Sequence, residues 1–213
     1  MAALLWDMNG VLVDDEPLQQ EAWKETLEAA NLYYDPDWWV KHFLGRRAST
    51  SLAKVMPELS EEERSAIIIE KRQRYNEIAA AHLPVGPGSL EMLEAARLQG
   101  IVQALVSSNN PEAIDLVIDR LGTRHYFAAI VSGTDVKVSK PHPECFLLAA
   151  KQLNEEPEEC WVIEDSLFGI EAAHAANMRC VALTTSLSAH ALSHAEIVVD
   201  TLSAELLEQL LDF

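Results

Sequence analysis

Short apolar runs recur along the chain and alternate with helical patterns at 111–121, 143–153 and 167–176. Strands that alternate with helices are typical of βαβ units, and nearly continuous apolar strands are typical of a parallel sheet covered on both faces. The pattern therefore predicts an α/β fold around a parallel sheet. We expect its strands at 4–8, 102–106, 128–131, 160–163, 180–183 and 197–199.

The segment 15–82 differs from the rest because it carries helical patterns without strands. Pro17 fits the first turn of a helix, and Ser60 with Glu63 fits a capping box at the start of another helix. The turn-rich sequence "LPVGPG" at 83–88 closes the segment. The sequence therefore predicts an inserted all-α lid. We assign 1–14 and 83–213 to the core and 15–82 to the lid.

Composition and charge narrow the classes of partner. With 49% hydrophobic and 23% charged residues, the chain is an ordinary globular protein. Its formal charge of −18 argues against nucleic acid and anionic membranes as partners, because both are negatively charged and bind positively charged proteins. No apolar run approaches the roughly 20 residues of a membrane span, and no signal peptide is recognisable. We expect a cytoplasmic protein that is a monomer or a weak homo-oligomer.

The three cysteines give no sign of a disulfide framework or a thiol metal site. Cys145, Cys160 and Cys180 form no C-x-x-C pair, their number is odd, and their neighbours are apolar. His190 and His194 have the i, i+4 spacing of a helical zinc pair, but no third ligand is apparent nearby. We therefore expect buried cysteines and surface histidines.

Polar side chains follow several of the expected strands. Ligands of open parallel sheets bind outside the carboxyl ends of the strands, so these positions are candidate site residues. Each also has a simpler interpretation, since the serines and acids would serve as helix caps, Lys140 as a solvated lysine, and Asn9-Gly10 as a hairpin turn. The candidates are Asp7, Asn9, Ser107, Ser108, Asn109, Lys140, Glu164 and Asp165.

Taken together, the candidates form a set suited to phosphoryl transfer. Asp7 ends an apolar strand, where a carboxylate is costly unless it is paired or bound to a metal. A carboxylate nucleophile, a hydroxyl and a lysine are groups that attack and hold a phosphate. Mg²⁺ suits Asp7 and Asp165, because it binds through few protein carboxylates and keeps waters and substrate oxygens.

Four segments in this order resemble the motifs of the haloacid dehalogenase superfamily. They are "WDMNGVLVDDE", "LVSSN", "VSKPHPECF" and "WVIEDSLFGIEAAHAANMRCVAL". The helical insert after the first motif is similar to the cap of the beta-phosphoglucomutase and phosphoglycolate phosphatase-like branch. The resemblance covers nearly the whole chain. It implies a Rossmann-like core, an all-α cap and phosphatase activity on a small phosphorylated metabolite.

The resemblance also implies a role for each candidate. Asp7 would become an aspartyl phosphate, and Ser107 and Lys140 would bind the phosphate, with further donors from Ser108 and Asn109. Arg46 and Arg47, in "LGRRAS", resemble the specificity loop and would reach a distal anionic or sugar group, although solvation on a helix face is an equal alternative. Mg²⁺ would be held by Asp7, Asp165 and the backbone carbonyl of Asn9, with Glu164 supporting through water.

Two positions depart from the family pattern, and the first of them, Asn9, is either a natural residue or an introduced inactivating change. Phosphatases and mutases of the family carry Asp two residues after the nucleophile, where this chain has Asn9, and an amide does not shuttle protons at neutral pH. General acid–base catalysis is worth roughly 10²–10⁴-fold, so we expect a slow enzyme with a long-lived phosphoenzyme. Gln19 stands where the mutases carry histidine, which favours a phosphatase over a sugar phosphomutase.

Other functions stay open at the level of sequence. The first alternative is a beta-phosphoglucomutase-like phosphomutase, and the second is a phosphate-binding homologue whose turnover is impaired by Asn9. A 2-haloacid dehalogenase is disfavoured, because that branch does not need the metal site that Asp165 would complete. The aromatic sequence "YYDPDWW" at 33–39 lines either the substrate pocket or, as we expect, the core of the lid.

Overall fold

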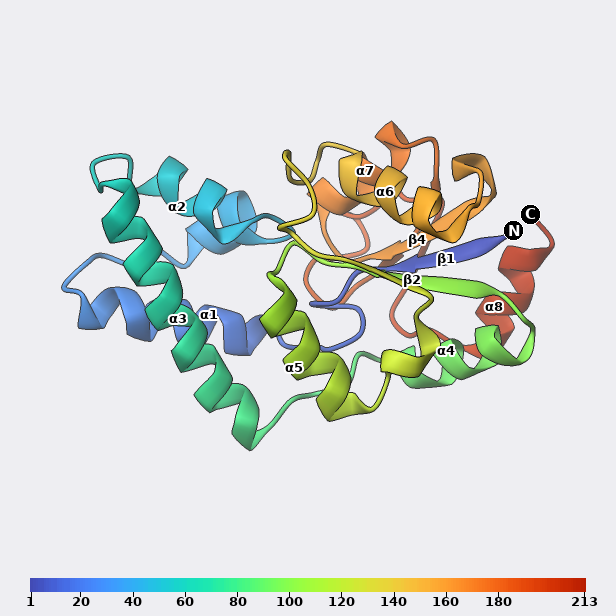
Figure 1. Ribbon diagram of the computed structural model, residues 1–213, viewed down its shortest axis with the longest axis horizontal. Helices are drawn as coiled ribbons and strands as arrows, with labels where there is room; N and C mark the ends of the chain where they lie inside the picture. The colour runs from blue at the N-terminus through green and yellow to red at the C-terminus, as the bar shows by residue number, and fades with distance from the viewer.

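The computed structural model describes residues 1–213 and shows two parts side by side (Figure 1). One part is a sheet covered by helices on both faces, and both chain termini lie at its far end. The other part is a group of helices that comes from the first half of the sequence and projects from the opposite end of the molecule. None of the helices is both long and apolar enough to cross a lipid bilayer.

The sheet has six parallel strands in the order β3-β2-β1-β4-β5-β6. This is the order of a doubly wound Rossmann-like sheet, so the predicted fold class is confirmed. The strand order reverses between β1 and β4, which lie side by side at the centre. The strands are β1 (Ala3–Trp6), β2 (Val102–Val106), β3 (Ala129–Val131), β4 (Cys160–Glu164), β5 (Arg179–Leu183) and β6 (Ile197–Val199).

Helices of the core cover both faces of this sheet. Figure 1 shows α6 and α7 above the sheet and α4, α5 and α8 below it. The bounds are α4 (Ser89–Leu98), α5 (Pro111–Leu121), α6 (Glu144–Leu153), α7 (Leu167–Ala175) and α8 (Ala204–Leu211), with short 3₁₀ turns at Arg124–Tyr126 and Pro157–Glu159.

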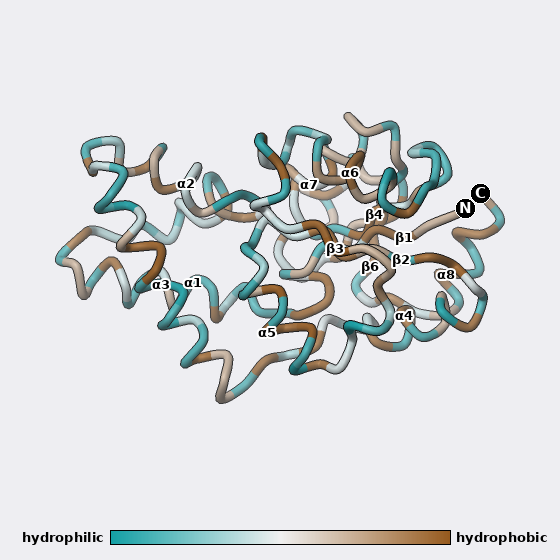
Figure 2. The backbone as a smooth tube through the Cα atoms, in the orientation of Figure 1, coloured by the Kyte–Doolittle hydropathy of each residue, from teal (hydrophilic) through white to brown (hydrophobic).

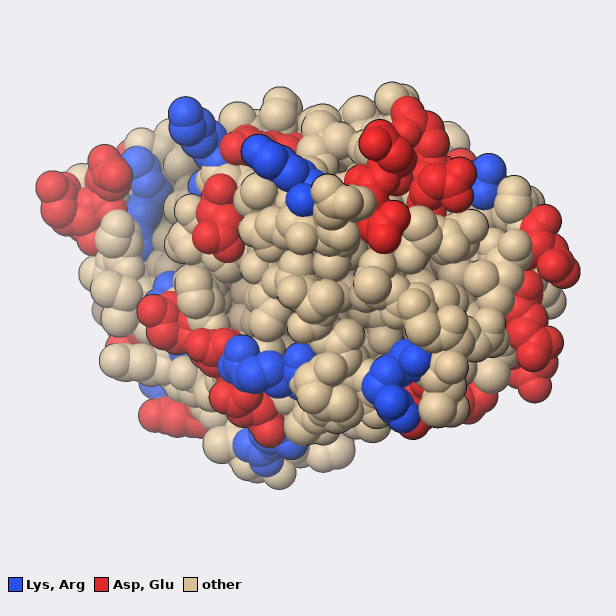
Figure 3. Space-filling model, turned by 45° about the vertical axis from the view of Figure 1, so that its right-hand side comes forward, with Lys and Arg blue, Asp and Glu red and all other residues tan.

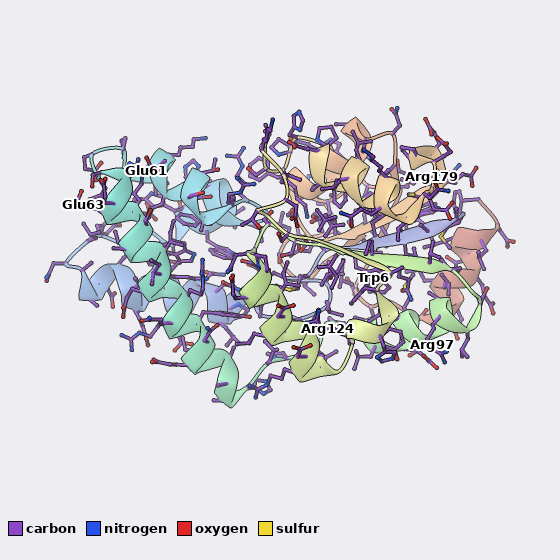
Figure 4. All side chains as sticks on the ribbon, in the orientation of Figure 1. Trp6, Glu61, Glu63, Arg97, Arg124 and Arg179 are labelled. Carbon is purple, nitrogen blue, oxygen red and sulfur yellow. The ribbon has the colours of Figure 1, made fainter.

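Alternate residues of β1 belong to different hydrophobic clusters. Leu5 packs in the cluster that includes α6 and α7, whereas Leu4 and Trp6 pack in the cluster that includes α4, α5 and α8. Figure 2 accordingly shows hydrophobic colour along the central strands. Trp6 is fully buried and donates its indole N–H to Gln103 at 3.0 Å (Figure 4). Alternation thus explains how a continuous apolar run serves two faces.

The inserted cap consists of helices only. They are α1 (Glu16–Ala29), a π-helix (Trp39–Phe43), α2 (Ala48–Val55) and α3 (Glu61–Ala81). Ser60 and Glu63 form the predicted capping box at the start of α3, with Glu61 and Glu63 at its outer end (Figure 4). The division at 14/15 and 82/83 stays a prediction; α1 begins at Glu16 and α3 ends at Ala81.

The aromatic sequence at 33–39 belongs mostly to the core of the cap. Trp39 is 8% exposed and packs with Trp23 and Phe43, while Tyr33 is 72% exposed. Trp39 also lines the cavity described below, so both interpretations of this segment describe part of it. The face in Figure 3 has acidic side chains at both ends, with further acidic and basic side chains around a broad central area without charge.

Candidate active site

The site lies where β1 and β4 end, at the reversal of the strand order. Asp7 follows β1 directly, Glu164 is the last residue of β4, and Asp165 comes next. All three side chains are at least nine-tenths buried by residue exposure. The parallel sheet therefore brings together carboxylates that are far apart in the sequence, at the place where such sheets bind ligands.

Lys140 joins two of these carboxylates. Its Nζ donates to Asp7 Oδ1 at 2.5 Å and to Glu164 Oε1 at 2.5 Å, and the lysine itself is 2% exposed. Burial alone would lower the pKa of Lys140, but Asp7 and Glu164 raise it above its usual range. Burial raises the pKa of Asp7 to about 7, with Lys140 opposing this shift. The simple interpretation of Lys140 as a solvated residue is therefore wrong.

Glu164 is held on its second oxygen as well. Oε2 accepts the backbone N–H groups of Asp165 at 3.0 Å and Ser166 at 3.1 Å, and the Ser166 hydroxyl at 2.9 Å. Ser166 also caps α7 by accepting from the N–H of Gly169, so the cap interpretation applies to Ser166. A Cβ on Gly169 would lie 1.8 Å from the Glu164 carboxyl carbon, which explains glycine at this position.

Asp165 faces the turn that follows β1. Its Oδ2 accepts a hydrogen bond from Ser186. Burial, with the charges of Glu16 and Glu164, raises the pKa of Asp165 well above its usual range. Gly10 has φ of +75°, and a Cβ there would lie 1.9 Å from Asp165 Oδ2. Position 10 therefore needs glycine both for its backbone and for the approach of Asp165.

The hairpin interpretation of Asn9-Gly10 is wrong. Residues 11–13 form no strand next to β1; instead Gly10 donates to Val13 at 2.7 Å within a compact turn. Thr185 donates its hydroxyl to the Gly10 carbonyl at 2.5 Å, which ties the turn to the loop after β5. The turn presents Asn9 to the same cavity as Asp7 and Asp165.

The polar residues after β2 lie beside this turn. Ser107 is 3% exposed, and its hydroxyl accepts the N–H of Asn109 at 3.2 Å. Asn109 donates its side-chain amide to Asn9 Oδ1 at 2.6 Å, and Ser108 donates to the Gly45 carbonyl of the cap at 3.3 Å. Helix α5 has Asn110 at its N-cap without a side-chain cap bond, so Ser107, Ser108 and Asn109 do not act as its cap.

The two cap arginines have different surroundings. The Arg46 guanidinium lies over the Phe168 ring, 3.7 Å from its centroid, and lines the cavity that contains Asp7. Arg47 instead donates to two core carbonyls, that of Gly133 and, at 2.9 Å, that of Val136. Arg46 thus faces the site, and Arg47 joins the cap to the core.

Two neighbouring cavities lie between cap and core. The smaller, of about 70 Å³, is lined by Asp7, Asn9 and Asp165 from the core and by Glu16 and Trp39 from the cap. The larger, of about 430 Å³, is lined by cationic and uncharged residues and by no Asp or Glu. The cavities share Gln19, Ala48, Lys71, Ser108 and Asn109.

Four residues near the site were not singled out from the sequence. Glu16 is 6% exposed, and its Oε2 has no hydrogen-bond partner. Burial and the charges of Asp15 and Asp7 raise the pKa of Glu16 well above its usual range. Asp15 is fully buried and is the N-cap residue of α1. The sequence did show two acids directly before Pro17. Acids are common at a helix start because they interact favourably with the helix dipole, so these two gave no indication that they are buried.

Lys71 and Tyr75 are the other two, and both come from α3. Lys71 donates to Gln19 Oε1, and Tyr75 donates to Asp15. Burial lowers the pKa of Lys71 to about 8, although Asp15 and Glu16 oppose this shift. Burial raises the pKa of Asp15, while hydrogen bonds from Tyr75, Asn9 and Gln19 act in the other direction. Only the packing of α3 on α1 creates these contacts.

The residues present fit a hard divalent cation. Asp7 and Glu164 share Lys140, while Glu16 and Asp165 lie nearby without an ion pair, and burial together with the neighbouring carboxylates raises the pKa values of Asp7 and Asp165. No three His, Cys, Asp or Glu side chains form a complete metal site. Mg²⁺ typically takes only one or two protein carboxylates and completes its shell with waters and phosphate oxygens, so this donor set suits it.

The remaining expectations from the sequence concern other regions. Cys145, Cys160 and Cys180 are free and buried, as expected. His190 and His194 belong to no metal-binding group of side chains.

Comparisons with known proteins bear on the whole arrangement. Residues 1–177 match the model described as haloacid dehalogenase-like hydrolase. Fructose-1-phosphate phosphatase YqaB of Escherichia coli is 32% identical over 190 residues, which cover 84% of this chain and 95% of that one. The phosphorylated carbohydrates phosphatase of Thermotoga maritima is 34% identical over 184 residues, covering 84% and 82%. The crystal structure of beta-phosphoglucomutase from Clostridium difficile has a TM-score of 0.88 at 28% identity and covers 100% of this chain and 97% of that one.

Proposed function

The chain belongs to the haloacid dehalogenase-like hydrolase family, and we propose that it is a Mg²⁺-dependent phosphatase of small phosphorylated metabolites that works through phosphorylation of Asp7. Relatives named as phosphatases cover most of both chains, which supports phosphatase activity and substrates of the phosphorylated-sugar class. A single observation carries the proposal at the level of residues. Asp7, held by Lys140, shares a cavity with Asp165 beneath the cap.

In the proposed reaction, a carboxylate oxygen of Asp7 forms a bond to phosphorus while the bond to the leaving-group oxygen breaks. Water then attacks the aspartyl phosphate, releases phosphate and regenerates Asp7. Lys140 holds Asp7 in place and offsets the charge that gathers on the phosphoryl oxygens. Ser107, Ser108 and Asn109 supply donors near the phosphate. Closure of the cap excludes bulk water from the smaller cavity, which contains Asp7.

Mg²⁺ would be held by Asp7, Asp165 and the backbone carbonyl of Asn9, with Glu164 supporting through water. When bound, it offsets the charge between the Asp7 carboxylate and the phosphoryl group. Two carboxylates and a carbonyl are the hard oxygen ligands that Mg²⁺ prefers.

Asn9 limits the proposed reaction because its amide donates a hydrogen bond but carries no transferable proton at neutral pH. A loss of roughly 10²–10⁴-fold is the usual scale for a missing general acid or base. The loss should be smallest for aryl and acyl phosphates, whose leaving groups need little protonation. It should be largest for sugar phosphates, which leave as alkoxides.

The lining of the larger cavity favours a substrate that carries a polar or anionic group in addition to the phosphate that Asp7 attacks. Arg47, Lys71 and Arg72 line it without any carboxylate, in a chain with a formal charge of −18. Such a local excess of positive charge favours an anionic ligand. A phosphomutase is less well supported, because Gln19 is engaged by Asp15 and Lys71 and carries no proton to transfer. A cytoplasmic location and a monomeric or weakly associating state stay predictions.

A phosphate-release assay tests this proposal. The chain and its Asp7→Asn variant are incubated with sugar phosphates and with an aryl phosphate, in Mg²⁺ and in EDTA. We expect Mg²⁺-dependent release that Asp7→Asn abolishes, while Asp212→Asn, an exposed carboxylate near the end of α8, retains it. Release that survives Asp7→Asn would exclude the assigned nucleophile. Tight phosphate binding without any release would instead support the non-catalytic alternative.

A further inference from the structure

The Asn9 side chain is fixed at both ends. Its Nδ2 donates to both oxygens of Asp15, at 2.9 Å and 2.7 Å, and its Oδ1 accepts from Asn109 Nδ2 at 2.6 Å. The amide nitrogen therefore faces only acceptors on one side, and the amide oxygen faces a donor on the other. The hydrogen-bond network leaves the amide of Asn9 one orientation.

Asp15 is matched to this arrangement. It is 0% exposed and forms no ion pair; instead it accepts from the neutral donors Asn9, Gln19 and Tyr75. Lys71 contacts Gln19 and not Asp15 itself. Because all hydrogen-bond partners of this buried carboxylate are donors, a donor at position 9 is part of what keeps Asp15 satisfied.

A carboxylate at position 9 would break this match. Two acceptor groups would then face each other at the 2.7–2.9 Å now spanned by hydrogen bonds, and one of them, Asp15, is 0% exposed. Simple replacement of Asn9 by Asp is therefore not a clean return to the family pattern, as long as Asp15 is present.

The reverse pair fits after a small rotation of the side chain at position 15. Asp15 Oδ1 accepts only from Asn9, whereas Oδ2 accepts from Asn9, Gln19 and Tyr75. An amide at position 15 with its nitrogen in the place of Oδ1 would donate to a carboxylate at position 9. Its oxygen would still accept from Gln19 and Tyr75 once the rotation takes it out of the 2.7 Å contact with position 9. The carboxylate at position 9 would keep its hydrogen bond from Asn109. One carboxylate and one amide remain, in exchanged places.

We propose that Asp15 is a positioning residue that orients Asn9, and that position 9 can carry an effective proton-shuttling carboxylate only when Asp15 is replaced as well. Asn9 is thus a built part of this site, matched to a buried residue of the cap junction. The catalytic half of this inference rests on the proposed phosphatase function, while the pairing of positions 9 and 15 does not.

A double-mutant cycle tests the inference with two independent readouts. The variants are Asn9→Asp, Asp15→Asn and the double variant. In thermal unfolding, we expect each single variant to lose at least about 2 °C in Tm and the double variant to recover most of that loss. Asn110→Asp is the matched control, because Asn110 also donates to a carboxylate, that of Glu112, but at an exposed position where water replaces the bond. Its Tm should change little.

The second readout is kcat on two substrates. With a sugar phosphate, the double variant should gain about 10²–10⁴-fold over the parent chain, and Asn9→Asp alone should gain less than a tenth of that. With p-nitrophenyl phosphate, whose leaving group needs little protonation, the gain of the double variant should be much smaller. This difference separates a restored proton shuttle from a general repair of the fold.

Each result decides the inference. If Asn9→Asp alone equals the double variant in Tm and in kcat, the pairing is wrong. If Asn9→Asp does not fold, recovery of folded protein in the double variant supports the pairing, and failure of both contradicts it. If Tm shows the coupling but no variant releases phosphate, the pairing holds and the proposed phosphatase function fails.

Discussion

Asp7 and Asp15 are both buried carboxylates beside the active-site cavity, but they have different partners. Asp7 shares Lys140 with Glu164 in a direct ion pair inside the core. Asp15 accepts hydrogen bonds only from neutral donors, two of them from the cap. The charged group of the core holds the Asp7 carboxylate that we propose as the nucleophile. The neutral network at the junction fixes the orientation of Asn9 and ties the helices of the cap to the site.

Replacing the lysine near each carboxylate, Lys140 near Asp7 and Lys71 near Asp15, should reveal the largest difference in stability between the two regions. Lys140→Met leaves Asp7 and Glu164 buried without a cation, so we expect a loss of about 3–5 kcal/mol in the free energy of unfolding. Lys71→Met removes a cation that forms no ion pair but donates to the neutral Gln19 and lies over the Trp23 and Tyr75 rings, so its loss should be clearly smaller. Denaturant unfolding in EDTA measures both, since bound Mg²⁺ would replace part of the missing charge. Equal losses would contradict the distinction between the two regions.

A pair of glycine substitutions tests whether the close approach of Asp165 to position 10 is needed for metal binding. Gly10 and Gly100 have nearly equal φ values, +75° and +73°, but only Gly10 has a neighbour within 4 Å of an added Cβ. Both changes to Ala should cost about 1 kcal/mol or slightly more for the backbone. Gly10→Ala should also displace Asp165 and weaken Mg²⁺ binding by about 10–100-fold, measured by titration calorimetry. Unchanged Mg²⁺ affinity in Gly10→Ala would show that Asp165 does not hold the metal.

The pH dependence of metal binding is a milder test of the same region. The pKa of Asp7 is raised to about 7, and that of Asp165 is raised well above its usual range. Protons therefore compete with Mg²⁺ as the pH falls through about 7, and the affinity should decrease by up to about tenfold per pH unit for each proton displaced. Calorimetry in buffers of different ionisation enthalpy should detect proton release on binding. An affinity that does not vary across this range would place Mg²⁺ elsewhere.

The same two regions differ in how far the sequence predicts them. The helix at 111–121 and the strands at 102–106 and 197–199 have the predicted bounds, because apolar runs and turn residues mark them locally. The first strand ends at Trp6 and not at residue 8, since the chain enters the turn at Asp7. Asp7 was predicted as a site residue because parallel strands deliver their ends to one edge of the sheet. Lys140 stands before α6 and not at the end of a strand, so its prediction rested on its place in the set suited to phosphoryl transfer.

The cap junction was not predicted for a physical reason. Asp15 meets Tyr75 only because α1 and α3 pack together, and their separation of 60 residues carries no periodic signal. Arg46 and Arg47 are equivalent by pattern, and only the structure shows that Arg47 contacts the core carbonyls while Arg46 lines the cavity. Side-chain contacts between packed helices depend on register and crossing, which hydropathy does not specify.

The central claim, that Asp7 receives the phosphoryl group and that Asn9 slows its hydrolysis, is tested most directly by rapid quench and peptide mapping. The chain is mixed with Mg²⁺ and an aryl phosphate, quenched in acid at intervals, digested and analysed by mass spectrometry. We predict that the peptide containing Asp7 carries one phosphoryl group on that residue, that this species accumulates during turnover, and that Asp7→Asn lacks it. Release of phosphate while Asp7 stays unmodified at every time point would contradict the claim.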